Sequence, residues 1–194
     1  NSEPITAIIN KSQLKHLMLM APSFEEYFGI QMFRESATSH EGCRDFVSLR
    51  VHGIEIDAYR RLTNFRTRKN YGDYYARQIQ KGNYHVMDFL DWKVPLDVVF
   101  LLNPFVSERP ILAWGLPLSK LRPQDIFDHL YTLLKPSNGF AIISSPSDDE
   151  FEIIHTFAKQ AGFRLKHSGL WTPTASCVQK KPRYGVVLDV QKDR

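Results

Sequence analysis

Acidic and amide side chains end three apolar segments of the chain, and they are the strongest candidates for chemistry. Glu55 and Asp57 end the segment 46–57, Asp88 is the strand-end acid of the short segment 84–92, and Asn103 follows the apolar run 97–102. The carboxyl ends of parallel strands meet at one edge of a sheet, where α/β proteins bind ligands. A carboxylate at the end of a second strand can accept both hydroxyl protons of a ribose, so a ligand of that kind is expected at this edge.

A helix followed by a turn and a strand must position these side chains. Pro123 suits a first helical position, and a row of apolar residues spaced along 126–134 forms a buried face. The helix ends in Leu-Lys-Pro, a Ser-Asn-Gly turn follows, and residues 140–145 form a continuous apolar run. A second helix from about 147 to 161 leads to strands at 163–170 and 184–190. This order predicts an α/β fold with a mostly parallel sheet, an antiparallel last strand and helices on both faces.

The first 35 residues are expected to be helical. Ser12 can cap a helix with Leu14, Leu17, Met18 and Met20 on one face, and a second helix is expected at 24–33 after Ser23. This segment either packs on the core or covers a pocket as a lid. The expected organisation is a single domain, 1–194, with a helical segment or lid at 1–35 and an α/β core at 47–194.

Composition excludes several classes of protein. The chain has 194 residues, of which 43% are hydrophobic and 24% charged, and these are ordinary globular values. Its apolar runs are too short to span a membrane. Two distant cysteines and scattered histidines indicate neither a metal site nor a disulfide framework and favour a reducing, cytoplasmic compartment. The sequence contains no P-loop, no G-x-S-x-G elbow and no G-x-G-x-x-G motif.

Basic and aromatic residues are interleaved over residues 59–69, which belong to a segment, 58–81, that is expected to be helical with a break at 70–72. Arginines with intervening aromatic rings suit single-stranded nucleic acid, because cations bind phosphates and rings stack on bases. The alternative is a solvated helix face, since acids elsewhere nearly balance the formal charge of +4. Nucleic acid is therefore the less favoured partner, and Arg66 and Arg68 are the residues whose replacement would test it.

The motifs from Gly53 onward resemble class I S-adenosylmethionine-dependent methyltransferases. In that family a fourth strand ends in a polar residue and proline, a helix ends in Leu-Lys-Pro before the fifth strand, and Ala-Gly-Phe precedes the sixth. The resemblance implies S-adenosylmethionine as cofactor and a Rossmann-like methyltransferase fold. Segments at 104–106, 114–117 and 183–185 are similar to a bacterial branch of these proteins. The cofactor-binding residues that the resemblance implies are Glu55, Asp57, Asp88, Phe89, Asn103 and Gly42.

The glycine-rich turn that follows the family's first strand is the main departure. Gly42 is the candidate for it, but no apolar strand precedes this glycine, and few residues separate it from the second strand. Either the loop has degenerated, or residues around 38–50 are absent from this sequence. The first alternative would weaken cofactor binding, and the second would restore it.

The function expected from the sequence is methyl transfer from S-adenosylmethionine to a small molecule. Asn103-Pro104-Phe105 is similar to the Asn-Pro-Pro-aromatic motif of methyltransferases that act on amino groups, although the second proline is absent, and Asn103 is the candidate catalytic residue. Two alternatives stay open: an interaction module that kept the fold without turnover, and a protein that binds or modifies nucleic acid through residues 59–69. The acceptor, the general base and the oligomeric state are not indicated.

Overall fold

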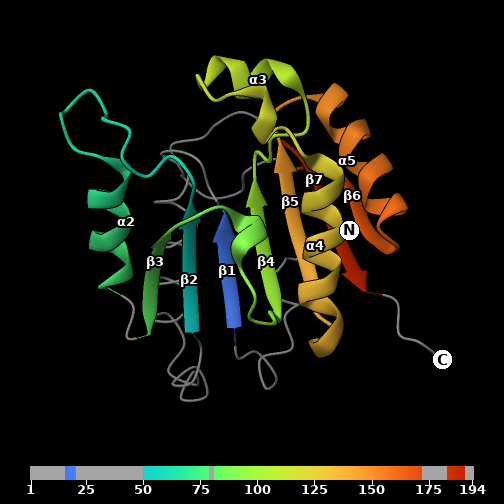
Figure 1. The fold of residues 1–194 in the computed structure, drawn as a ribbon. Helices are drawn as coiled ribbons and strands as arrows, with labels where there is room; N and C mark the ends of the chain where they lie inside the picture. The colour runs from blue at the N-terminus through green and yellow to red at the C-terminus, as the bar shows by residue number, and fades with distance from the viewer. Residues whose placement is uncertain (1–15, 21–49, 79–80, 172–182, 191–194) are drawn as a thin grey trace.

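Seven strands form one mixed sheet. The computed structural model describes residues 16–20, 50–78, 81–171 and 183–190, and in these residues the strand order is β3-β2-β1-β4-β5-β7-β6. β7 runs antiparallel to both β5 and β6, and the other pairs are parallel. The mostly parallel sheet predicted from the sequence is confirmed. The strands are β1 (His16–Met20), β2 (Arg50–Glu55), β3 (Gly82–Val86), β4 (Val98–Leu102), β5 (Phe140–Ser145), β6 (Phe163–Trp171) and β7 (Arg183–Val190) (Figure 1).

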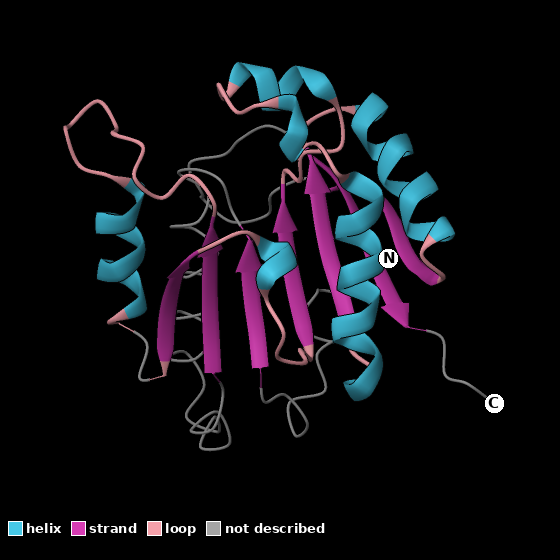
Figure 2. Ribbon diagram, in the orientation of Figure 1, coloured by secondary structure: helices cyan, strands magenta, loops and turns pink. Residues whose placement is uncertain are grey.

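Helices pack on both faces of this sheet (Figure 2). Tyr84 on β3 packs against α2 (Arg68–Ala76), whereas Ile54 on β2 packs into the core under α4 (Pro123–Leu134). Alternation along paired strands puts these two side chains on opposite faces of the sheet. In the described part of the chain, no helix is long and apolar enough to cross a membrane. The helices are α2 (Arg68–Ala76), α3 (Glu108–Ala113), α4 (Pro123–Leu134) and α5 (Asp148–Gln160), with 3-10 turns η3 (Phe89–Asp91), η4 (Leu118–Lys120) and η5 (Lys135–Ser137).

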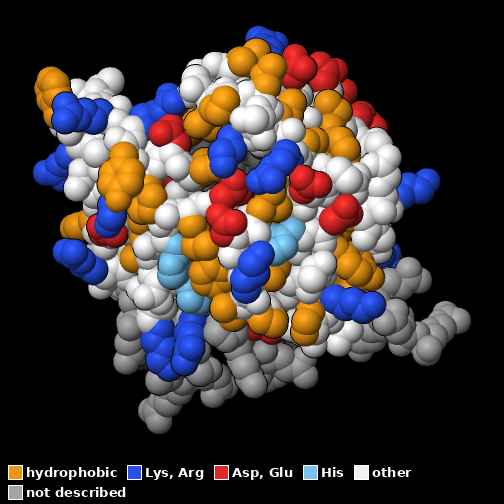
Figure 3. All heavy atoms as spheres, in the orientation of Figure 1, with side chains coloured by type: hydrophobic (Ala, Val, Ile, Leu, Met, Phe, Trp, Pro, Cys, Tyr) orange, Lys and Arg blue, Asp and Glu red, His pale blue; other side chains and the backbone are white. Residues whose placement is uncertain are grey.

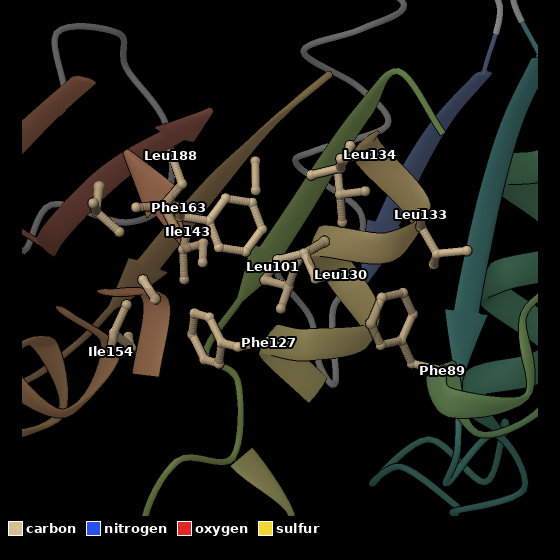
Figure 4. Packing of buried hydrophobic residues seen from close by; sticks show 14 of the residues in the cluster. Phe89, Leu101, Phe127, Leu130, Leu133, Leu134, Ile143, Ile154, Phe163 and Leu188 are labelled. Carbon is tan, nitrogen blue, oxygen red and sulfur yellow. The ribbon is translucent and has the colours of Figure 1, made fainter. Parts of the chain in front are cut away.

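The core lies between the sheet and the helices α4 and α5 (Figure 4). α4 begins at Pro123, as predicted, and its apolar face is buried against β4 and β5. Ser147 caps α5 by accepting a hydrogen bond from the Glu150 N–H group. The side chains that join these elements are nearly inaccessible to solvent, and they include Phe127, Leu130, Leu133, Leu134, Leu101, Ile143, Ile154 and Leu188.

The turn before β5 brings two backbone segments together. Asn138 adopts a left-handed conformation with φ 51°, and the next residue, Gly139, lies so close to β4 that an added Cβ would be 2.4 Å from the Asp97 carbonyl oxygen. The Phe140 N–H group then donates a 3.0 Å hydrogen bond to that same oxygen. Only glycine allows this approach, so the Ser-Asn-Gly turn sets where β5 begins to pair with β4.

The helix predicted around residues 12–20 is wrong over His16–Met20, which forms β1. This strand lies inside the sheet, third in the strand order, and pairs in parallel with both β2 and β4. A short apolar run does not distinguish a strand from a buried helix segment, and the neighbouring strands decide the outcome. The α/β core therefore includes residues 16–20, while the other residues of the predicted segment 1–35 lie outside the described ranges.

The Arg-rich helix predicted at 59–69 is also wrong. Arg61 and Thr67 form an antiparallel bridge, and α2 begins only at Arg68. Thr67 and Asn70 form a capping box, which ends the preceding loop and starts the helix. Residues 70–72 do not break this helix. Gly72 lies within it, where an added Cβ would be 2.3 Å from the Tyr84 ring.

Replacing Gly72 with alanine is expected to destabilise the protein. The same change in an open helix interior would stabilise it by about 1 kcal/mol, but overpacking against Tyr84 should instead lower the unfolding free energy by about 1–3 kcal/mol. Urea denaturation measures the difference. In a Tyr84→Ala background the alanine should become neutral or stabilising, and a stabilising effect in the wild-type background would contradict the packing described here.

Candidate functional site

A cleft opens at the carboxyl ends of β2 and β4 and beside the segment that follows β3. Four of the predicted site residues line it together, although they are distant in sequence. Its walls are largely apolar, and charged side chains enter at a few points. This combination of apolar walls and few polar groups is typical of small-molecule sites. The lining residues are Ile54, Glu55, Ile56, Met87, Asp88, Phe89, Leu90, Leu101, Leu102, Asn103, Pro104, Phe105, Leu116, Lys120, Arg122 and Ile126.

Glu55 is the most buried acid of the cleft. Its side chain is 3% exposed, and its Oε1 atom accepts a 2.8 Å hydrogen bond from the Asp57 N–H group. Its Oε2 atom lies 3.7 Å from Arg68 Nη1 but accepts no hydrogen bond from any group in the described ranges. Burial raises the pKa of Glu55, while the Asp57 N–H group and the Arg68 charge oppose that rise. A buried acceptor without a donor suits a ligand that carries hydroxyl groups.

Arg68 connects this acid to the far wall of the cleft. Its guanidinium group is buried, donates to Asp57 Oδ2 at 3.4 Å, and lies 3.9 Å from the centre of the Trp114 ring. Arg60 adds a second link, because it donates both to the Asp57 carboxylate and to the Trp114 carbonyl oxygen. Trp114 packs edge-on against Phe105, a lining residue, at 5.6 Å between ring centres. The two arginines thus hold the segment after β4 against the end of β2.

Asp88 lines the cleft from the segment that follows β3. Its Oδ1 atom caps η3 by accepting from the Leu90 N–H group at 3.2 Å. Its Oδ2 atom lies 3.2 Å from Lys120 Nζ and 3.5 Å from Arg122 Nη2. Both cations are close to half exposed and line the cleft, so the charge of Asp88 is balanced without being buried.

Asn103 ends β4 in a left-handed conformation with φ 56°. Its N–H group donates to the Ser144 carbonyl oxygen at 2.9 Å, and its Oδ1 atom accepts a hydrogen bond from Arg183 Nη2. The Asn side chain is therefore oriented by the strand β7. In the amino-group methyltransferases that Asn103-Pro104-Phe105 resembles, this oxygen would face the acceptor nitrogen, whereas here it already has a donor.

The remaining predicted site residues differ in position. Phe89 is 3% exposed and lines the cleft from the core, where its ring contacts His129. Asp57 does not line the cleft and pairs with Arg60 and Arg68. Gly42 lies outside the described residues.

The segment directly after β1 lacks glycine. The strand ends at Met20, and residues 21–28 read Ala-Pro-Ser-Phe-Glu-Glu-Tyr-Phe. The connection to β2, residues 21–49, lies outside the described ranges, but it is long enough for a parallel crossover. Counted from β1, the chain therefore needs no missing residues to reach β2.

Sequence reasoning missed the residues that support the acids. Arg68 was considered only as a ligand for nucleic acid, and Lys120, Arg122 and Arg183 were given no role at the cleft. The Thr67–Asn70 capping box could have placed Arg68 in the first helical turn. Its pairing with Glu55 depends on how α2 packs beside β2, which the local sequence does not show.

The described histidines do not form a metal site. No group of three or more metal-ligating side chains occurs in the described ranges. His52 Nδ1 and His85 Nε2 lie 3.2 Å apart, and both rings pack against Trp92. Burial lowers the pKa of His85 and so favours its neutral form, and both rings contribute to packing against Trp92.

The strand order 3-2-1-4-5-7-6, with an antiparallel β7 and a cleft at the carboxyl edge, defines the fold of class I S-adenosylmethionine-dependent methyltransferases. Many solved structures of this class match the chain. No protein-family model matches the sequence. No curated protein matches it either.

Three of these structures illustrate the similarity. A methyltransferase from Methanosarcina mazei matches with TM-score 0.59 and 8% identity over 100% of both chains. An O-methyltransferase from Thermotoga maritima matches with TM-score 0.58 and 12% identity over 98% of this chain and 64% of that one. Magnesium protoporphyrin IX methyltransferase from Synechocystis, with S-adenosylmethionine bound, matches with TM-score 0.56 and 11% identity over 96% and 74%. At such identities the likeness establishes the fold alone.

Removing the Arg68 guanidinium is expected to destabilise the fold strongly. An Arg68→Met variant leaves Glu55 and Asp57 without their buried cation, which should cost about 3 kcal/mol in unfolding free energy. A double variant with Glu55→Gln should lose less, because one uncompensated carboxylate is gone. Arg122→Met is the matched control, since loss of an exposed pair costs at most about 1 kcal/mol. Equal losses for Arg68→Met and Arg122→Met in denaturant titrations would refute this role.

The histidine pair predicts a pH dependence. Because burial lowers the pKa of His85 in the folded state, the unfolded chain binds more protons once the pH falls below about 6.5. The contribution of His85 to the unfolding free energy is therefore fully present above that pH, and it is lost as the pH falls through the pKa that His85 has in the folded state. A His85→Gln variant should show a smaller drop in unfolding free energy between about pH 7 and 5.5 than the wild type. An equal drop in the wild type and in His85→Gln would contradict this role of His85.

Proposed function

We propose that the protein binds S-adenosylmethionine in the cleft at the carboxyl edge of the sheet and transfers its methyl group to a small molecule. The observation that carries the proposal is Glu55, a buried acid at the end of β2 whose Oε2 atom accepts no hydrogen bond from the described groups. A ribose carries two adjacent hydroxyl groups, and either could donate the hydrogen bond that Glu55 Oε2 does not receive from the described residues. The methyltransferase fold of the chain also supports this proposal.

Arg68 and the Asp57 N–H group would prepare Glu55 for this role. Burial favours the neutral acid, which can accept less well, and these two groups favour the carboxylate. Asp57 itself would act through Arg60 and Arg68 rather than by touching the cofactor, since it does not line the cleft.

The adenine would lie beside Asp88 and Phe89, between apolar side chains from the ends of β2 and β4. Asp88 can accept from an exocyclic amino group while Lys120 and Arg122 balance its charge. The apolar walls exclude water from the ring and supply its contact area. Ile56, Met87 and Leu102 are the lining residues that would provide it.

Asn103 would lie next to the methyl acceptor. S-adenosylmethionine supplies a methyl group on a sulfonium centre, which transfers by in-line displacement and depends chiefly on orientation. Asn103 is oriented for this by its hydrogen bond from Arg183. Because its Oδ1 atom already accepts from a cation, recognition of an amino group as in the Asn-Pro-Pro-aromatic proteins is not supported, and we leave the acceptor as a small molecule of unspecified class.

A second candidate is a protein that kept the fold without turnover. The observation that favours it is the segment after β1, where residues 21–28 contain no glycine. In the family, glycine at this place leaves room for the methionine part of the cofactor. Binding of the cofactor by the full chain separates the two candidates.

Isothermal titration of the full chain with S-adenosylhomocysteine tests the proposal. Glu55→Gln should weaken binding about tenfold or more, because hydrogen bonds to a charged acceptor are lost. The same variant should lose some stability, because Glu55 helps to compensate the buried charge of Arg68, so binding is compared at a temperature at which circular dichroism shows both proteins folded. Glu152→Gln, at an exposed position of α5, is the matched control and should bind as the wild type does.

Two results would contradict the proposal. If the wild-type chain binds neither S-adenosylhomocysteine nor S-adenosylmethionine, the candidate without turnover is favoured. If the wild type binds but Glu55→Gln binds equally well, the cofactor is held elsewhere than at the end of β2.

A further inference from the structure

A basic hairpin projects from the sheet between β2 and α2 (Figure 1). We use this name for residues 59–68. Residues 58–82, which include the hairpin and α2, contain seven Lys and Arg residues and one acid, whereas the whole chain has 25 and 21. The net positive charge of the protein is therefore concentrated in this segment. On the side where Figure 1 places α2, Figure 3 shows Lys and Arg side chains with few acidic neighbours.

Hydrogen bonds hold the basic hairpin in one conformation. The Leu62 N–H group donates to the Arg66 carbonyl oxygen at 2.8 Å, and the Phe65 N–H group donates to the Leu62 carbonyl oxygen at 2.9 Å. Arg61 and Thr67 pair below these contacts as an antiparallel bridge. The loop is thus organised before any partner binds, which lowers the entropy cost of binding.

Phe65 at the tip has no packing role. Its side chain is 85% exposed, and its φ of 63° lies in the left-handed region that bulky residues rarely adopt. An aromatic ring held outward in an unfavourable backbone conformation points to function rather than to stability. Tyr59 and Tyr74 are exposed nearby in the sequence, at 68% and 57%.

The cations of residues 59–69 fall into two groups. Arg60, Arg68 and Lys69 form ion pairs with Asp57, Glu55 and Asp73 and so belong to the fold. Arg61 and Arg66 are exposed and form no ion pair with the residues that the structure describes. These two flank Phe65 on the chain, so guanidinium groups and an exposed ring occur together on one rigid loop.

We propose that the basic hairpin binds single-stranded nucleic acid, with a base stacked on Phe65 and phosphates on Arg61 and Arg66. Every base offers a face for stacking, and the two arginines supply the charge that backbone phosphates require. An anionic membrane is a poorer fit, because one projecting ring buries little apolar surface in lipid. The proposal concerns a surface outside the cleft lining and does not depend on methyl transfer.

Fluorescence anisotropy of the full chain with a labelled single-stranded RNA, and with DNA of the same sequence, tests this proposal. With a mixed-sequence oligonucleotide of about 15 nucleotides, Phe65→Ala should weaken binding about tenfold. An Arg61→Gln/Arg66→Gln double variant should reduce the slope of log K against log [KCl] by about 1.4, the value for two phosphate contacts on a single strand.

Matched controls separate the hairpin from general surface effects. Leu170→Ala removes an exposed apolar side chain of β6, and Arg109→Gln/Lys159→Gln removes two exposed cations elsewhere. Both should leave the affinity and the salt slope unchanged, and all variants should bind S-adenosylhomocysteine as the wild type does. Four results would overturn the proposal: no salt-dependent binding by the wild type, wild-type affinity in Phe65→Ala, an equal change of slope in the control double variant, or binding to phosphatidylserine vesicles without binding to either oligonucleotide.

Discussion

The contact of Arg68 with Glu55, Asp57 and Trp114 is the constraint on which the cleft depends. A guanidinium group this deeply buried is stable only where acids and an aromatic face replace its water. By meeting that requirement, Arg68 joins three segments: the end of β2, the first turn of α2, and the chain that follows β4. Together with Arg60, which bonds both Asp57 and the Trp114 carbonyl oxygen, Arg68 therefore positions the wall that carries Phe105 and Leu116 relative to the acid of the cleft.

The two sides of the carboxyl edge differ in how well they suit the cofactor. On the side of β2 and β3, the acids, the apolar walls and the Glu55 Oε2 atom, which accepts no hydrogen bond from the described groups, support the proposal of an adenosine-like ligand. On the side of β1, the chain continues into Ala-Pro-Ser in place of a glycine-rich turn. Glycine matters there because a side chain would occupy the space that a ligand needs. The cleft thus favours binding of the nucleoside part more clearly than it favours turnover.

The basic hairpin shows how a charged segment divides into structural and exposed residues. Arginines that alternate in sequence look equivalent, but Arg60 and Arg68 turn toward the acids after β2, while Arg61 and Arg66 stay in solvent. A count of charged residues in the sequence therefore predicts a larger nucleic-acid surface than the structure has, and it includes arginines that belong to the fold. In the described part of the chain, the exposed cations Arg61 and Arg66 flank Phe65, which is 85% exposed.

Sequence alone determined the second half of the fold and the polar strand ends. Local patterns predict the apolar face of α4 and the apolar runs of β4 and β5, because apolar side chains are buried. The Leu-Lys-Pro and Ser-Asn-Gly turn is also a local pattern, because only glycine allows two backbone segments to come so close. Glu55, Asp88 and Asn103 were predicted because parallel strands align their carboxyl ends. Only the tertiary structure decided that His16–Met20 is a central strand and that Arg68 belongs to Glu55. Both outcomes depend on residues that are distant in sequence. β1 is a strand because it pairs with β2 and β4. Arg68 and Glu55 form a buried ion pair because the packing of α2 beside β2 brings them together.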